Sequence, residues 1–310
     1  MEIINWQVGF SKLEIESVVA IIGNFDGVHI GHKKLIDDAK KTAQKSKLKL
    51  AIMTFEPHPR MFFSKASDNF LIQSKDDKIK ELSKLQIDYF FNIKFDSNLS
   101  SFRAEEFIKE ILHNKLNIKH VVVGKDFLFG KNREGNISTL QNIGEKINLK
   151  VSTIEIVKND NFKISSTKIR ELIREGNVEL ANKYLGRNFS ISGQVIHGDK
   201  IGKKINFPTA NIKLLNHFRP AFGVYAVNIT SNKFKNMMGI ANIGNRPTVN
   251  YVGELLEAHI FDENIDLYDE TISVEFLKFI RPEKKFNGID DLKKQILLDE
   301  KIVREFFKNL

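Results

Sequence analysis

The 310-residue sequence contains no cysteine. Disulfide bonds, thiolate nucleophiles and cysteine-based zinc or iron–sulfur sites are therefore excluded. Any catalytic site has to be built from other side chains, from backbone groups or from a bound ion. A chain without cysteine also fits a reducing compartment, so we expect the protein to work in the cytoplasm.

Long apolar stretches are missing as well. No window reaches the roughly 18 uncharged apolar residues that a membrane-spanning helix needs. The N-terminal segment carries Glu2 and has no apolar core of the kind found in a signal peptide. We therefore expect no membrane partner.

The common nucleotide-binding signatures do not occur either. The sequence holds neither a Walker A motif nor a G-x-G-x-x-G motif. The glycine-rich run Gly198–Lys204 comes closest, but it lacks the P-loop spacing and the Ser/Thr that follows it. Any ATP chemistry in this chain must use a different phosphate site.

The sequence does have an excess of positive charge, with a formal net charge of +9. Such an excess is found in nucleic-acid-binding proteins. Here, however, Lys and Arg are interleaved with Asp and Glu along the whole chain, and Lys greatly outnumbers Arg, the better bidentate phosphate ligand. We expect no dedicated nucleic-acid binding, and a positive field equally attracts small polyphosphates.

The first half of the chain alternates strand-like and helix-like segments. Apolar runs at Val18–Ile22, Leu48–Phe55 and His120–Val123 read as strands, and a helical pattern follows the first of them over Gly31–Ser46. This alternation predicts a parallel sheet that helices cover on both faces. Ligands bind such sheets beyond the carboxyl ends of the strands.

The periodicity changes after a hinge-like Gly186-Arg187, and we divide the chain into domains 1–185 and 186–310. From Phe189 onward, short apolar runs follow one another without intervening helices. That pattern predicts an antiparallel barrel or sandwich. A long amphipathic helix from Ile289 closes the chain.

The densest cluster of unusual residues runs from Gly23 to His32, directly after the first apolar strand. A strand, a glycine-rich turn and a helix start form a natural phosphate site, because free N–H groups and the helix dipole meet there. His29 and His32 share a face of the first helical turn. They either stabilise charge on a leaving pyrophosphate or are partly buried histidines of an ordinary turn. The local spacing offers no third ligand for a metal site.

Three further segments of the first half allow two readings each. His58 stands between two prolines in a rigid turn, which on its own favours a simple connection. Phe127 and Phe129 follow a strand end and either stack on a flat heterocycle or belong to the core. The run from Ser165 to Arg170 either holds phosphate or caps a helix.

The second half offers two candidate positions. Thr209 and Asn211 lie two apart on an extended segment, so their oxygen atoms share a face and suit Mg²⁺. Glu257 interrupts an apolar strand, where a carboxylate is costly without a partner. It is either a general base or a solvent-facing residue, and alternation alone permits both.

Taken together, the motifs resemble the prokaryotic bifunctional riboflavin kinase/FMN adenylyltransferases, also called FAD synthetases. Seven motifs match in the family's order across both halves. They are Gly23–His32, Thr54–Pro59, Val123–Gly130, Ile164–Arg170, Pro208–Asn211, Asn242–Thr248 and the pair Glu257-x-His259.

The resemblance implies an α/β plus β architecture. A Rossmann-like nucleotidyltransferase domain with a parallel sheet would precede an antiparallel riboflavin-kinase β-barrel with a C-terminal helix. The second domain would phosphorylate riboflavin with ATP and Mg²⁺, and the first would transfer AMP from ATP to FMN, giving FAD and pyrophosphate. Riboflavin, FMN and ATP are the expected partners of a monomer or weak homo-oligomer.

The same resemblance implies roles for individual residues. His29 and His32 would be electrostatic catalysts, Glu257 the general base of the kinase step, and Thr209 and Asn211 the Mg²⁺ ligands. The expected ATP-binding residues are Gly23, Phe25, Asp26, His29, His32, Ser165, Ser166, Thr167, Arg170, Gly198, Gly202, Lys203, Thr209 and Asn211. The expected flavin-binding residues are His58, Asp126, Phe127, Phe129, Asn242, Arg246 and Arg281.

Two positions depart from the family pattern. Asn206 and Asp269 stand where glycine is usual, and both positions look turn-like. Two competing hypotheses remain: an enzyme with one active domain, and a basic RNA- or flavin-binding regulator that has lost turnover. The intact His29, Thr209 and Glu257 argue against both.

Overall fold

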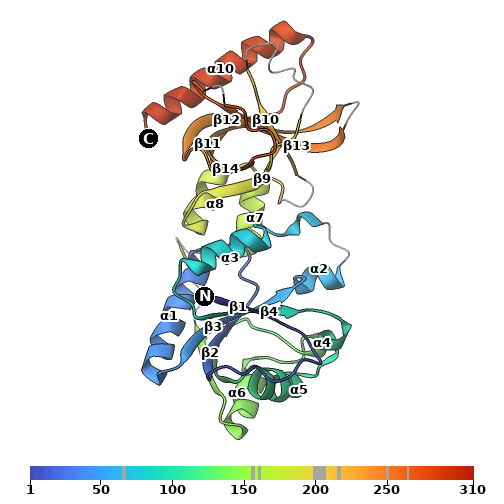
Figure 1. The fold of residues 1–310 in the computed structure, drawn as a ribbon, viewed down its shortest axis with the longest axis vertical. Coiled ribbons are helices and arrows are strands. Elements are labelled where there is room, and N and C mark those ends of the chain that lie inside the picture. The colour runs from blue at the N-terminus through green and yellow to red at the C-terminus, as the bar shows by residue number, and fades with distance from the viewer. Residues whose placement is uncertain are drawn as a thin grey trace. The chain divides into compact units, whose positions relative to one another are not determined.

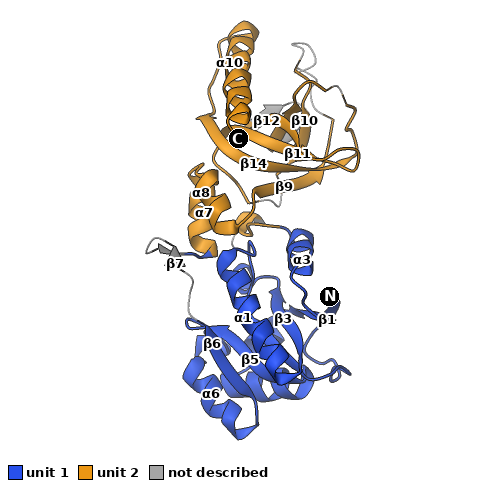
Figure 2. Ribbon diagram, turned by 90° about the vertical axis from the view of Figure 1, so that its left-hand side faces the viewer, with its two compact units in different colours: residues 1–67, 74–165 blue, residues 68–73, 166–310 orange. Residues whose placement is uncertain are grey.

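The structure is a computed structural model that describes residues 1–64, 68–154, 158–159, 162–197, 207–214, 218–248, 251–263 and 265–310. It divides into two compact units (Figure 2). Unit 1 comprises residues 1–67 and 74–165, and unit 2 comprises residues 68–73 and 166–310. The helices over 166–185, which the sequence assigned to the first domain, group with unit 2 because their contacts lie there.

Unit 1 is built on a six-stranded sheet in the order β1-β4-β3-β2-β5-β6, of which Figure 1 labels β1 to β4. All of its strand pairings are parallel. The predicted parallel sheet is thus confirmed, with β1 as an additional edge strand. The strands are β1 (Glu2–Trp6), β2 (Val18–Ile22), β3 (Lys49–Glu56), β4 (Tyr89–Lys94), β5 (Ile118–Gly124) and β6 (Lys150–Ile154).

Helices cover both faces of this sheet, as predicted. On one face, Ile36 of α1 and Leu82 of α3 pack against buried residues of the central strands. On the other face, Phe107 and Leu112 of the π-helical segment η2 and Leu140 of α6 form the second core. The helices are α1 (Ile30–Ser46), α2 (Pro59–Phe63), α3 (Lys75–Ser83), α4 (Ser97–Ser101), α5 (Ala104–Glu106), η2 (Phe107–Lys115) and α6 (Ile137–Lys146). Unit 1 also contains the single helical turn η3 (Lys131–Arg133) and two short strands, β7 (Lys158–Asn159) and β8 (Phe162–Lys163).

The winding of the chain fixes where ligands can bind. From β2 the chain proceeds through β3 to β4 on one side, and then crosses to β5 and β6 on the other. β2 and β5 are neighbours, and the direction of winding reverses between them. This reversal is a topological switch point, where open α/β sheets bind ligands beyond the carboxyl ends of the strands.

Unit 2 is an antiparallel near-barrel in the order β10-β13-β12-β11-β14-β9. A bridge between Ile196, just after β9, and Asn211 on β10 brings the two edge strands together. The predicted antiparallel architecture is confirmed. Its elements are η1 (Asp68–Phe70), α7 (Ser166–Arg174), α8 (Val178–Leu185), β9 (Phe189–Gln194), β10 (Ala210–Lys213), β11 (Gly223–Thr230), β12 (Met237–Thr248), β13 (Tyr251–Ile260), β14 (Thr271–Pro282) and α10 (Ile289–Lys308).

The C-terminal helix α10 lies along one face of the barrel (Figure 1). Val303 is its buried apolar contact, in a cluster with Val224 and Phe261. A buried ion pair adds to it: Arg281 of β14 donates from Nε and Nη2 to the carboxylate of Asp299 at 2.7–3.0 Å. The predicted amphipathic helix is present, and a charged pair as well as its apolar stripe fixes it to the barrel.

Transmembrane helices are not found in the part of the chain that the structure describes.

Candidate functional sites

The loop between β2 and α1 leaves the sheet at the switch point with an unusual backbone. Phe25 and Val28 adopt positive φ angles of 50° and 39°, and Gly27 lies between them at 84°. Such angles are costly for bulky and β-branched residues, and they cluster at functional sites. The side chains of Phe25, Asp26 and Val28 are all at most 2% exposed. Burial of these three side chains therefore holds a strained loop in place.

His29 caps α1 and thereby acquires a defined tautomer. Its Nδ1 accepts a hydrogen bond from the backbone N–H of His32 at 3.2 Å. Because Nδ1 is the acceptor, the ring proton of neutral His29 sits on Nε2, which is then a donor. A donor at the positive end of a helix is suited to a phosphate oxygen.

The two histidines form one layered unit. Their rings stack at a centroid distance of 3.6 Å and an interplanar angle of 13°, and Phe25 lies 5.0 Å from the His32 ring on a tilt. A Cβ atom on Gly31 would come within 3.1 Å of the His29 ring. Glycine at position 31 is therefore what lets the first turn of α1 pass this close to the imidazole.

A buried lysine, Lys78 of α3, lies behind this loop. It is 5% exposed, and the carboxylates that act on it are Asp26 and Glu56. Burial lowers the pKa of the Lys78 ammonium, and the two carboxylates oppose that shift. Lys78 thus connects the loop after β2 with the end of β3. Lys78 belongs to no recognisable sequence motif, although its i, i+4 spacing to the buried Leu82 places it on the inner face of α3.

His58 repeats the arrangement of His29 at the end of β3. It is 9% exposed and caps the short helix α2, with Nδ1 accepting from the backbone N–H of Arg60 at 3.1 Å. Its neutral form therefore also carries the proton on Nε2. Its expected contact with the flavin remains a prediction.

The segment after β5 separates two aromatic residues that the sequence treated alike. Phe129 is 7% exposed and packs in the core at 5.8 Å from the Phe107 ring. Phe127 is only half-buried and stacks on Phe129 at 5.3 Å. Asp126 is exposed beside Gly124, where an added Cβ would lie 3.2 Å from its carboxylate. Phe127 and Asp126 therefore present more surface to a flavin than Phe129 does.

The Ser165–Arg170 motif spans the boundary between the units. Ser165 closes unit 1, whereas Ser166, Thr167 and Arg170 lie on α7 of unit 2. Arg170 is 7% exposed, and its guanidinium lies 4.2 Å from the centre of the Phe70 ring. The expected contacts of these residues with ATP phosphates remain predictions.

In unit 2, strand register assembles the candidate site. Glu257 of β13 pairs with Asn211 of β10 on one side and with Asn242 of β12 on the other. Directly opposed residues of antiparallel strands share a face, with Cβ atoms about 4.5–5.5 Å apart. Three expected site residues therefore form one row across the sheet: the metal ligand Asn211, the base Glu257 and the flavin contact Asn242. Asn211 is buried, and the other two are half-buried.

The row continues to Val224 and Arg281, opposed in turn across β11 and β14. Val224 packs in the cluster beneath α10. The row thus lies on the barrel face that α10 covers. The guanidinium of Arg281 also donates to the Pro282 carbonyl, so its described hydrogen bonds are structural and its flavin contact remains a prediction.

Some expected site residues are not described. Gly198, Gly202, Lys203 and the departure Asn206 lie outside the described residues, and the same holds for the side chain of Arg246. The other departure is turn-like, as expected: Asp269 has a positive φ of 64°.

The donor set fits Mg²⁺ better than a caged transition metal. Within the described residues, no group of three His, Asp or Glu side chains is arranged to hold a metal ion. Thr209 and Asn211 supply neutral oxygen donors instead. Mg²⁺ in phosphate-transfer sites is typically held by one or two protein oxygens together with substrate phosphates and water.

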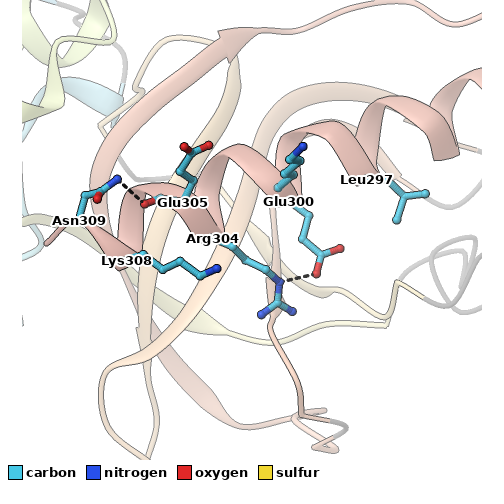
Figure 3. A pocket seen from close by; sticks show the side chains of 7 residues that line it. Leu297, Glu300, Arg304, Glu305, Lys308 and Asn309 are labelled. Carbon is cyan, nitrogen blue, oxygen red and sulfur yellow. Dashed lines mark hydrogen bonds and ion pairs between the residues drawn. The ribbon is translucent and has the colours of Figure 1, made fainter.

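A separate open pocket runs along the outer face of α10 (Figure 3). Arg304 donates to Glu300 at 2.8 Å inside it. None of the expected site residues lines this pocket, and its lining is Leu297, Glu300, Lys301, Arg304, Glu305, Lys308 and Asn309.

Comparison with known proteins finds both halves of the chain in one family. A sequence model of FAD synthetase matches residues 11–168, and one of riboflavin kinase matches residues 185–307. The chain is 43% identical over 310 residues to the bifunctional riboflavin kinase/FMN adenylyltransferase of Buchnera aphidicola subsp. Schizaphis graminum, covering 99% of both chains. It is 38% identical to the protein of that name from Escherichia coli K12, covering 99% of this chain and 98% of the relative.

A solved structure shares the whole fold. A Streptococcus pneumoniae chain described as a macrolide-efflux protein superposes with a TM-score of 0.86 at 31% identity, covering 97% of this chain and 98% of that one. Its described role differs from that of the curated relatives. With both family models matched and full-length relatives near 40% identity, this chain belongs to the bifunctional riboflavin kinase/FMN adenylyltransferase family, the bacterial FAD synthetases.

Proposed function

We propose that the two units carry out consecutive steps, with unit 2 making FMN and unit 1 converting it to FAD. The chain is a riboflavin kinase and FMN adenylyltransferase by family. Beyond these family activities, we propose which residues carry out each step. The observation that supports it most strongly is the row Asn211–Glu257–Asn242, because it gathers three differently predicted residues on one barrel face.

The kinase step needs a base because its nucleophile is an alcohol. Glu257 takes the proton of the ribityl 5′-hydroxyl, whose oxygen attacks the γ-phosphorus of ATP while ADP leaves. Thr209 and Asn211 would hold Mg²⁺, which, when bound, would supply charge neutralisation for phosphoryl transfer. Asn242, on the other side of Glu257, is placed to orient the riboflavin.

The adenylylation step needs no strong base, because the phosphate of FMN is already ionised at neutral pH. One of its oxygens attacks the α-phosphorus of ATP, and pyrophosphate leaves. The work of unit 1 is to position the reactants and to stabilise the charge that develops on the leaving group. His29 and His32 do so at the start of α1, with the His29 Nε2–H as a donor. Both ATP-dependent steps are expected in the cytoplasm.

One incubation tests the proposal. Pure protein is mixed with ATP, Mg²⁺ and riboflavin, with FMN replacing riboflavin in a parallel sample, and flavins are separated by chromatography. FMN followed by FAD is the expected result. FMN alone, or FAD only from supplied FMN, would leave one unit active, and the absence of both products would favour a flavin-binding regulator instead.

A further inference from the structure

The kinase site contains a histidine that the proposed mechanism does not use. His259 lies two residues after Glu257 on β13, and side chains two apart on a strand share a face. Its Nδ1 lies 2.7 Å from the carbonyl oxygen of Pro208. Because a carbonyl only accepts hydrogen bonds, Nδ1 of His259 is the donor.

The His259 ring also makes an aromatic contact with the same segment. It lies 3.9 Å from the Phe207 ring at an interplanar angle of 31°. A second aromatic residue, Phe261, meets its edge at 6.0 Å. The imidazole is therefore held between the segment before β10 and the apolar cluster under α10.

The hydrogen bond between His259 and Pro208 lies just before the paired part of β10 and β13. β10 begins at Ala210, which pairs with Ala258, so Phe207, Pro208 and Thr209 precede the ladder. Proline has no N–H and a fixed φ, so its segment is stiff but offers fewer hydrogen bonds. A single bond to the Pro208 carbonyl is thus well placed to set the position of the next residue.

We propose that His259 is a positioning residue for the kinase step, acting through the Pro208 carbonyl on Thr209. The bond fixes Thr209 so that its hydroxyl lies on the same side as the Asn211 amide oxygen, which readies both for the Mg²⁺–ATP complex. His259 itself touches neither the reacting atoms nor the ion. The inference rests on the proposed roles of Thr209 and Asn211.

The protonation state of His259 agrees with this role. Burial lowers its pKa, although the bond to Pro208 and the nearby carboxylates of Glu300 and Asp262 act in the other direction and Arg304 adds to the lowering. The ring is thus neutral at pH 7, with its one proton on Nδ1.

Paired variants separate the hydrogen bond from the packing. His259→Phe keeps a ring against Phe207 but has no donor. His259→Asn loses the ring but places an amide N–H near the former Nδ1. We expect His259→Phe to raise the KM for Mg–ATP in riboflavin phosphorylation by about 10–10²-fold, the cost of a misplaced binding group. His259→Asn should stay within a few-fold of wild type.

Three controls accompany this pair. Adenylylation of supplied FMN reports on unit 1 and should not change. Phe261→Leu loosens the same aromatic cluster without touching Pro208, and should leave the KM for Mg–ATP unchanged. If His259→Phe does not fold, the isosteric pair His259→Asn and His259→Asp repeats the comparison, since only asparagine can donate.

A second readout needs no turnover. Hydrogen exchange by mass spectrometry on peptides covering residues 207–213 should show protection by ADP and Mg²⁺ in wild type and His259→Asn, and its loss in His259→Phe. Equal KM values in the Asn and Phe variants, or an equal rise in Phe261→Leu, would overturn the proposal. A wild type that makes no FMN would instead refute the proposed function, while the exchange experiment would still decide whether His259 holds the segment.

Discussion

The two units build their proposed catalytic sites by opposite means. Unit 1 uses one contiguous loop, Gly23–His32, whose strained backbone is held by buried side chains at the switch point of a parallel sheet. Unit 2 uses Asn211, Asn242 and Glu257, which are distant in sequence and meet through antiparallel register. Strain and burial fix the first site, whereas the strand ladder fixes the second.

This difference predicts different responses to mutation. In unit 1 the site and the stability of the loop depend on the same residues, so a substitution there affects both. In unit 2 the ladder is held by backbone hydrogen bonds, so a half-buried side chain on its face can be changed with little effect on folding. The variants below test this contrast.

Removing Glu257, the proposed base of the kinase step, should give the largest effect. Glu257→Gln keeps the size of the side chain and the register of β13, but it cannot take the proton of the ribityl hydroxyl. We expect riboflavin phosphorylation to fall by about 10²–10⁴-fold, the usual contribution of a general base. Thermal unfolding should hardly change, and FAD formation from supplied FMN should be unaffected. A loss of both activities would show that a side-chain change in unit 2 also disturbs unit 1, against the expectation that β13 keeps its structure.

The matching experiment in unit 1 removes the buried lysine. Lys78→Met keeps the length of the side chain and leaves the 2%-exposed Asp26 without its ammonium neighbour. Removing one of two interacting buried charges destabilises the charge that remains. We expect a lower melting temperature for unit 1 together with weaker FMN adenylylation, because the strained loop at Phe25 and Val28 loses its support.

Lys80→Met is the matched control, since Lys80 is exposed on the same helix. Riboflavin phosphorylation in unit 2 serves as an internal reference for both variants. Adding Asp26→Asn to Lys78→Met should recover part of the lost stability, because the neutral amide no longer depends on a nearby ammonium. If Lys78→Met melts like Lys80→Met, the loop is held by its apolar anchors alone.

A third variant separates capping from chemistry at the start of α1. Asparagine is a good N-cap, so His29→Asn keeps the acceptor for the His32 N–H while removing the imidazole. We expect adenylylation to fall by about 10²–10³-fold, as when one oxyanion donor is lost, with little change in stability. His29→Ala should show the same loss of rate plus about 1 kcal/mol of destabilisation. Equal rates in wild type and His29→Asn would reduce His29 to a helix cap.

The same contrast explains what could be predicted from sequence. The strand Val18–Ile22 has the predicted bounds, because all five of its residues are apolar and buried. The edge strand β1 was missed, since only Trp6 of its five residues is buried. The four-residue β10 was recognised as extended but not as a strand.

The candidate sites divide in the same manner. The phosphate loop is contiguous, so its residues and the helix that follows could be read directly. Its positive φ angles at Phe25 and Val28 could not, because bulky residues rarely adopt them and only the surrounding core enforces them. For Glu257, alternation left the base and the solvent-facing reading open. Only the register with Asn211 and Asn242 shows which face it occupies.

The smallest expected effect concerns a buried histidine in unit 1 that lies away from the phosphate loop. His120 sits near the start of β5, 9% exposed, with Nε2 2.8 Å from the Ser152 hydroxyl and Nδ1 buried without a hydrogen-bond partner. Burial, and to a lesser degree the cation of Lys150, lowers the pKa of His120. Because the unfolded chain then binds the proton more readily, this contribution to stability is present above the unfolded pKa of about 6.5 and is lost as the pH falls below it.

His120→Gln keeps a polar partner for Ser152 but does not titrate. Unfolding of unit 1, followed between pH 7.5 and 5, should therefore depend less on pH in the variant than in wild type. Adenylylation at pH 7.5 should stay within about twofold of wild type, because the substitution lies outside the loop Gly23–His32. In unit 2, the half-buried His259 is proposed to position the kinase site, so its replacement should alter the kinase step at neutral pH. An adenylylation defect in His120→Gln would show that His120, like His259, contributes to the activity of its unit.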